Sequence, residues 1–154
     1  MPNGPIFVAE YWSGWFDYWS GDHARVDVEQ VTSTTQIIFD LGGSINYYMF
    51  HGGTSWGYMA GANFFGNGYH PDVTSYDYAA PLTETGDVTP LYYAIRETIF
   101  KYLTEEEKKA LPPVPTNIPR RSYGDVYPEE SASLLPQINV VYHKIIKVSS
   151  IPYF

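Results

Sequence analysis

The sequence predicts an α/β fold with parallel strands, and three features indicate it. An apolar run at residues 5–9, a segment with helical periodicity at 27–41 and a strand-like run at 44–50 follow one another. Parallel neighbouring strands need a crossover of about a dozen residues or more, and a helix of roughly fifteen residues provides it. The chain has 154 residues, of which 44% are hydrophobic, so it can bury a core and is not of the disordered class.

The first predicted strand is Pro-Ile-Phe-Val-Ala at residues 5–9, and it ends at Glu10. A short continuous apolar run is typical of a strand that is buried on both faces. A carboxylate at the end of such a strand either takes part in chemistry or only caps or salt-bridges a loop, and its position alone favours neither. Aromatic residues follow at once, in residues 11–19.

The predicted helix extends from about Asp27 to Leu41. One face carries residues at helical spacing: Val28, Val31, Thr35, Ile38 and Leu41. Asp27 followed by Gln30 can cap the start, and Gly42-Gly43 can end the helix. Residues 32–35 are weak helix formers, yet a helix remains the better prediction.

Residues 51–88 are rich in glycine and aromatic residues and show no clear periodicity. A loop of this length in a compact domain is usually functional. A second helix is predicted to begin at Thr89-Pro90, where a cap precedes a first-turn proline, and to extend through residues 105–107 until Pro112-Pro113. Its apolar face consists of Leu91, Ile95, Ile99 and Leu103.

The remainder of the chain is predicted to be largely irregular. Four prolines between residues 111 and 119 indicate a semi-extended linker, and one strand-like apolar run follows at 138–142. We therefore expect residues 1–110 to form one structural unit and residues 111–154 to be a linker or the start of a following domain.

Composition excludes several classes of function. The net charge is −8 and no run of Lys or Arg exceeds two residues, so neither nucleic acid nor an anionic membrane is an expected partner. The absence of cysteine excludes disulfides and thiolate catalysis, and the four histidines have no metal-binding spacing. No apolar stretch is long enough to cross a membrane, and the first residues lack a signal-peptide pattern. Nucleophile-elbow and phosphate-loop motifs are absent.

Aromatic residues make up 18% of the sequence. Tyr and Trp offer flat apolar faces with polar edges, which match the C–H faces and hydroxyl rims of sugars. An aromatic-rich core explains the same composition. A carbohydrate ligand is therefore one of two interpretations that composition leaves open.

Three segments carry a resemblance to a known family. They are AEYWSGWFDYW at residues 9–19, SINYYMFHGGTSWG at 44–57 and TSYDYAAPLTETG at 74–86. In order and spacing they resemble the signature segments of glycoside hydrolase family 35, the β-galactosidase type, over about residues 4–103. The resemblance implies a partial TIM (β/α)8 barrel with its last two β-α units, in which residues 5–10 and 44–50 are strands seven and eight, plus an irregular proline-rich tail.

The resemblance also implies a retaining exo-glycosidase that hydrolyses terminal β-D-galactosyl residues through a covalent glycosyl-enzyme intermediate. It makes Glu10 the nucleophile, places galactose contacts at Tyr48 and Tyr76, and places walls of the sugar pocket at Trp12 and Trp15. One position departs from the pattern: several lysosomal relatives have Tyr where this sequence has Trp12, which removes a hydroxyl. This variant is more like the β-galactosidase-like animal relatives.

Simpler structural roles stay open for these side chains. Strand alternation can bury Tyr48 in packing, and Tyr76 with Asp77 can be a loop tyrosine beside a turn-stabilising aspartate. Trp15 can be a structural wedge instead of a sugar platform. The sequence does not separate these roles from sugar binding.

A retaining glycosidase needs two carboxyl groups about 5 Å apart, one ionised and one protonated. A tyrosine hydroxyl from Tyr48 or Tyr76 can keep the nucleophile ionised and aimed, and Trp faces can stack on the sugar ring. In the family, the general acid lies in an Asn-Glu-Tyr type motif of an earlier strand, and this chain contains no such motif. Asp17, Asp77 and Glu84 are conceivable replacements that no motif supports.

We therefore expect this chain to be a fragment that lacks the general acid, is inactive alone and folds poorly without the remainder of the barrel, because a partial barrel exposes its sheet edges. The alternative is a non-catalytic carbohydrate-binding or vestigial truncated form. The expected ligand is a β-galactoside or a related oligosaccharide, and no metal or organic cofactor is required. For a full-length parent, the resemblance implies a lysosomal or extracellular location.

Overall fold

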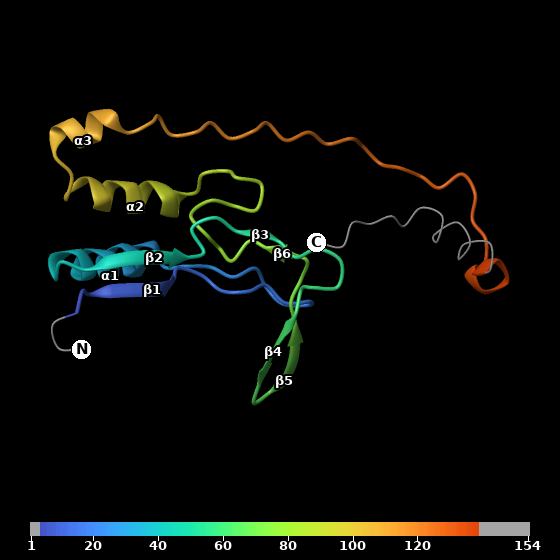
Figure 1. The fold of residues 1–154 in the computed structure, drawn as a ribbon. Coiled ribbons are helices and arrows are strands. Elements are labelled where there is room, and N and C mark those ends of the chain that lie inside the picture. Colours follow the sequence, from blue (N-terminus) through green and yellow to red (C-terminus); the bar gives the residue numbers. More distant parts are fainter. Residues whose placement is uncertain (1–3, 139–154) are drawn as a thin grey trace. The chain divides into compact units, whose positions relative to one another are not determined.

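The structure is a computed structural model that describes residues 4–138. The chain divides into a first unit that ends at Pro119 and a second that begins at Arg120. The predicted domain boundary after residue 110 stays a prediction. The first unit contains, in order, β1 (Phe7–Trp12), α1 (Val28–Asp40), β2 (Ser44–Tyr48), β3 (Gly53–Thr54), β4 (Ala62–Phe65), β5 (Gly68–Pro71), β6 (Ser75–Tyr76), α2 (Pro90–Phe100) and α3 (Glu105–Ala110) (Figure 1).

β1 and β2 form a parallel pair, and α1 is the crossover between them. Figure 1 shows the two strands side by side, with α1 next to them. The register shifts between Val8 and Tyr11, in the stretch that contains Glu10. This arrangement confirms the predicted α/β class and the parallel strands.

The prediction that the first strand is buried on both faces is wrong. Ile6 is 48% exposed and Phe7 is 59% exposed. Among the described residues β1 pairs only with β2, and Tyr11 is the residue of β1 that packs against the helical core. A continuous apolar run indicates that both faces of a strand can be buried. Whether they are buried depends on the segments that pack against the strand, and the run does not specify these.

Both predicted ends of α1 are confirmed. The Asp27 carboxylate accepts hydrogen bonds from the backbone N–H groups of Glu29 at 3.0 Å and Gln30 at 3.2 Å. At the other end, Gly42-Gly43 donate backbone hydrogen bonds to carbonyls of the last turn, with Gly42 at φ 73°. Leu41, which the periodicity placed on the apolar face, is 64% exposed because the chain leaves the helix there.

The core lies between α1 and α2, where Val31, Leu91 and Ile95 are buried together. Thr35 is fully buried on the same face of α1, and its hydroxyl bonds the Val31 carbonyl at 2.9 Å and the Tyr47 hydroxyl at 2.7 Å. Burial raises the pKa of Tyr47, so its phenol stays neutral. The core thus includes one satisfied polar contact that ties α1 to β2.

The second predicted helix is two helices. α2 begins at Pro90 behind the Thr89 cap, as predicted, but it ends at Phe100. α3 begins after Thr104, whose hydroxyl accepts from the Glu107 N–H while the Glu107 carboxylate accepts from the Thr104 N–H. This capping box starts a new helix, and apolar spacing alone did not reveal it.

Residues 51–88 contain more regular structure than predicted. β4 and β5 form an antiparallel hairpin closed by the two residues Gly66-Asn67, and β3 pairs with β6. A Gly-Asn pair between aromatic runs is a hairpin signal that a search for periodicity missed.

Residues 111–119 have no regular secondary structure, and residues 134–138 are helical. The strand-like run predicted at 138–142 lies, beyond its first residue, outside the described residues. None of the helices in the described range has both the length and the apolar composition to span a membrane.

Candidate active site

Glu10 lies near the carboxyl end of β1 and is exposed. Its Oε2 accepts a hydrogen bond of 3.1 Å from Nε1 of Trp12. Side chains two residues apart on a strand point to the same face, which explains why this pair can meet. The indole of Trp12 therefore presents its donor to the carboxylate.

Tyr48 and Tyr76 meet at a second point of the site. Tyr48 ends β2 and Tyr76 ends β6, and their hydroxyl oxygens are 2.7 Å apart. This contact brings together side chains that are separated by 28 positions in the sequence. Neither hydroxyl makes a described hydrogen bond to Glu10, so the aiming role expected of one of them stays a prediction.

Tyr78 joins the same cluster, although the sequence analysis did not select it. It is 2% exposed, and its ring stacks on Tyr76 at 5.5 Å with an angle of 6° between the planes. Burial first, and then the neighbouring Tyr48 and Glu10, raise the pKa of Tyr78 to about 12. The effect of Glu10 shows that Tyr78 lies within electrostatic reach of this carboxylate.

Burial and the hydrogen bond with Tyr48 also raise the pKa of Tyr76. Both phenols of the 76–78 segment therefore remain neutral at physiological pH and can donate hydrogen bonds. The signal that could have identified Tyr78 is its place two residues after Tyr76 within the third motif, although Tyr78 itself lies in a turn with φ 59°.

Trp15 is fixed by contacts on several sides. Its ring lies 5.3 Å from that of Trp12 and 6.1 Å from that of Tyr78. Its Nε1 donates to the Tyr18 hydroxyl at 2.6 Å, and that hydroxyl bonds Oδ1 of Asn63 at 3.1 Å. Trp15 thus links the aromatic loop to the β4–β5 hairpin, a structural role that also leaves its ring beside Trp12.

Two glycines let the loops of the site approach each other backbone to backbone. A Cβ at Gly14 would lie 1.6 Å from the Tyr78 carbonyl oxygen. A Cβ at Gly52 would lie 2.6 Å from the Asp77 carbonyl oxygen and 2.7 Å from that of Tyr76. The segment that carries the site tyrosines is therefore held between the loop after β1 and the loop after β2.

The three conceivable replacement acids are all engaged elsewhere. Asp17 bonds the ring of His23 and the N–H of residue 24, and Asp77 accepts from the Glu84 N–H at 3.1 Å. Glu84 accepts from Thr54, and hydrogen bonds from Ser75 and Thr54 lower its pKa. None of these described bonds involves Glu10, and an ionised Glu84 has no proton to give.

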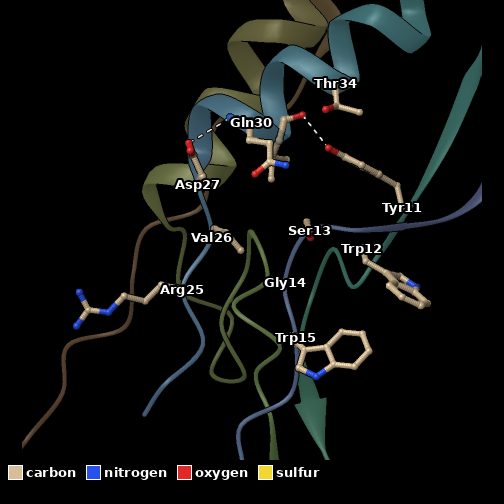
Figure 2. A pocket seen from close by; sticks show the side chains of 11 residues that line it. Tyr11, Trp12, Ser13, Gly14, Trp15, Arg25, Val26, Asp27, Gln30 and Thr34 are labelled. Carbon is tan, nitrogen blue, oxygen red and sulfur yellow. Dashed lines mark hydrogen bonds between the residues drawn. The ribbon is translucent and has the colours of Figure 1, made fainter. Parts of the chain in front are cut away.

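A pocket of about 440 Å³ lies between the loop after β1 and the start of α1 (Figure 2). Figure 2 shows Trp12 and Trp15 on one side, Gln30 and Thr34 on the helix, and Arg25 pointing away. Of the predicted site residues, Trp12 and Trp15 line this pocket, whereas Glu10, Tyr48 and Tyr76 do not. The predicted residues are therefore not gathered in one closed pocket. Trp12 and Trp15 line the pocket, whereas Glu10 and the Tyr48–Tyr76 pair lie outside its lining.

The described residues contain no group of three His, Asp or Glu side chains that could hold a metal ion. What the site offers is a carboxylate near the carboxyl end of a parallel strand, an indole donor on one of its oxygens, and a cluster of phenols joined by the contact of Tyr48 with Tyr76. Active sites of barrel enzymes lie at this end of their parallel strands, and most enzymes that cleave glycosidic bonds react through carboxyl groups.

The comparison with known sequences agrees with this class. The profile of glycosyl hydrolases family 35 matches residues 1–102, and the chain belongs to this family. It is 46% identical over 124 residues to the human protein named beta-galactosidase-1-like protein 2, a match that covers 80% of this chain and 19% of that protein.

Two further relatives carry the name beta-galactosidase. The cat protein is 39% identical over 140 residues, which are 91% of this chain and 20% of the relative. The human protein is 42% identical over 125 residues, which are 81% of this chain and 17% of the relative. The chain thus spans about a fifth of the length of the relatives that it matches.

Proposed function

We propose that this chain supplies the nucleophile side of a retaining exo-glycosidase that removes terminal β-D-galactosyl residues. Glu10 attacks the anomeric carbon, and the covalent glycosyl-enzyme intermediate is then hydrolysed by water. β1 and β2 are two neighbouring strands of a (β/α)8 barrel in this proposal. The names of the relatives support a galactoside as the substrate.

The observation that carries the proposal is the hydrogen bond between Trp12 and Glu10. It occupies one carboxylate oxygen, Oε2, and leaves Oε1 for attack on the sugar. Tyr48, Tyr76 and Tyr78 form a cluster of phenols whose hydroxyl groups can bind the hydroxyl groups of a sugar. Trp15 completes an aromatic wall with Trp12.

The general acid of the reaction is proposed to come from another part of the protein. The described bonds of the carboxylates at Asp17, Asp77 and Glu84 tie loops together, which gives each of them a structural role. A complete retaining pair needs a protonated carboxyl about 5 Å from Glu10. The 154 residues alone are therefore proposed to be inactive.

A second candidate function is a non-catalytic carbohydrate-binding or vestigial form. It is favoured by the same engagement of the three carboxylates, because a site with one free carboxylate can bind a sugar but cannot release the aglycone. The two candidates differ in whether a covalent intermediate forms on the complete gene product.

Trapping of that intermediate is the test of the proposed function. The complete gene product is incubated with an activated 2-deoxy-2-fluoro-β-galactoside, which slows breakdown of a glycosyl ester, and is then digested and analysed by mass spectrometry. We expect one added fluorogalactosyl group on the peptide that contains Glu10. Binding of galactose without labelling would favour the non-catalytic form, and a label on a different carboxylate would refute the assignment of Glu10.

The role of Trp12 can be separated into orientation of the nucleophile and stacking on the sugar. Trp12→Phe removes the N–H donor and keeps an aromatic face. If the donor orients Glu10, kcat falls about tenfold while KM for a chromogenic β-galactoside stays within about twofold, since a hydrogen bond to a charged group contributes roughly 1.5 kcal/mol or more.

Trp56→Phe provides the matched control, because Trp56 is 79% exposed and makes no described contact with the site. A rise in KM with unchanged kcat in Trp12→Phe would instead assign Trp12 to sugar stacking alone.

A further inference from the structure

His23 lies between two carboxylates that belong to different loops. Its Nδ1 is 2.6 Å from Oδ2 of Asp17, and its Nε2 is 3.8 Å from Oδ1 of Asp77. A carboxylate only accepts hydrogen bonds, so Nδ1 carries the hydrogen of the first contact. The second contact is an ion pair when the ring is protonated. One imidazole therefore contacts two segments that are 60 positions apart in the sequence.

Both carboxylates are also held by the backbone on their other oxygen. Oδ1 of Asp17 accepts from the N–H of Ala24 at 2.7 Å, and Oδ2 of Asp77 accepts from the N–H of Glu84 at 3.1 Å. Each aspartate side chain is only 19% exposed, whereas His23 is 60% exposed. Both carboxylates are therefore held in place on either side of the one ring.

The two loops that His23 joins are those that carry the proposed sugar site. Asp17 follows Phe16 in the aromatic loop after β1, and Asp77 lies between Tyr76 and Tyr78. The Phe16 ring contacts Tyr76 edge to face at 5.0 Å and Tyr78 at 5.3 Å. The contacts of His23 with the two aspartates thus connect the residues next to this three-ring contact.

We propose that His23 is a positioning residue that fastens the Tyr76–Tyr78 segment to the nucleophile loop through Asp17 and Asp77. It touches neither the sugar nor Glu10 in this proposal, and it acts by fixing where the two phenols present their hydroxyls. A shift of about 1 Å in a substrate-positioning group can cost as much as 100-fold in rate. The consequence for catalysis rests on the proposed function, whereas the fastening of the two loops does not.

The test compares variants of the complete gene product by two independent measurements. His23→Gln removes the imidazole ring that reaches both carboxylates, Asp77→Asn removes one of these carboxylates, and both variants keep hydrogen-bonding groups; a double variant combines them. His23→Arg places donors in several directions at the same position. Asp22→Asn is the control, because it removes a charge next to His23 on the same loop. The measurements are kcat and KM for a chromogenic β-galactoside, and amide hydrogen exchange of the peptide that spans residues 72–84.

We expect His23→Gln and Asp77→Asn to raise KM about 5- to 20-fold with kcat within about threefold, and to speed exchange of that peptide several-fold. The double variant is no worse than the more damaging single one, because both break the same connection. His23→Arg stays within about threefold of the parent protein, and so does Asp22→Asn.

The proposal is overturned if His23→Gln matches Asp22→Asn in exchange and in KM, or if the two single effects add in full. If the parent protein hydrolyses no β-galactoside, the proposed function fails. Hydrogen exchange alone then decides whether His23 fastens the two loops.

Discussion

Glu10→Gln is expected to lower kcat for a chromogenic β-galactoside by at least about 10³-fold, because an amide cannot form the glycosyl ester. Glutamine has nearly the same shape as glutamate, and its amide oxygen can still accept the hydrogen bond that Trp12 Nε1 donates to Oε2. The substitution therefore removes the proposed nucleophilic oxygen and keeps an acceptor for the hydrogen bond from Trp12. The measurement is the steady-state rate of the complete gene product.

The control for this result is Glu97→Gln, an exposed carboxylate on α2 that faces away from the buried core. It is expected to leave kcat within about twofold, and both variants are expected to share the parent's melting temperature within about 1 °C. Because kcat and KM of a two-step reaction both depend on the two steps, kcat/KM, which reports formation of the glycosyl ester, is expected to fall together with kcat. A Glu10→Gln enzyme that keeps more than a tenth of the parent activity would show that the nucleophile is another residue.

The elements that were predicted well from the sequence are those whose ends depend on residues close by in the sequence. Asp27 and Gly42-Gly43 sit at the ends of α1 because capping depends on a few neighbouring residues. The division between α2 and α3 was missed, although Thr104 and Glu107 have the spacing of a capping box. The helical spacing of apolar residues continues to Leu103, beyond the end of α2 at Phe100, and only the cap residues indicate that a new helix begins.

Burial was harder to predict than secondary structure. The apolar run before Glu10 indicated a strand covered on both faces, yet Ile6 and Phe7 are about half exposed. The residues of the run determine that it forms a strand. Whether the strand is buried depends on which other segments pack against its two faces. The same distinction explains why Leu41 fits the helical period and is nevertheless exposed.

In the site, contacts between near neighbours could be anticipated and contacts between loops could not. Trp12 and Glu10 are two residues apart on one strand, so their meeting follows from strand geometry. The inclusion of Tyr78 and the bridging position of His23 depend on how a distant loop folds back. The glycines at positions 14 and 52, where the loops touch, are the sequence features that reflect this close approach.

Gly14→Ala is therefore the substitution outside the reacting groups with the largest expected effect. The added Cβ would lie 1.6 Å from the carbonyl oxygen of Tyr78 and 3.3 Å from the Ala79 Cβ. The obstacle is backbone, which cannot rotate away as a flexible side chain does, so one of the two loops must move. We expect a loss of about 3 kcal/mol or more in the free energy of unfolding, a melting temperature lowered by more than about 5 °C, and displacement of Tyr78 from the site.

Gly53→Ala separates this steric effect from the general effect of replacing a glycine. Gly53 lies in β3, close in sequence to the same loops, but a Cβ there meets no atom within 4 Å. Its expected change in melting temperature is within about 1 °C, because alanine restricts the unfolded chain and meets no obstacle in the folded one. Equal melting temperatures for the two variants would mean that the loop after β1 does not touch Tyr78 in the folded protein. The contacts of Phe16 with Tyr76 and Tyr78 and the connection through His23 would then fail as well, because they join the same two segments.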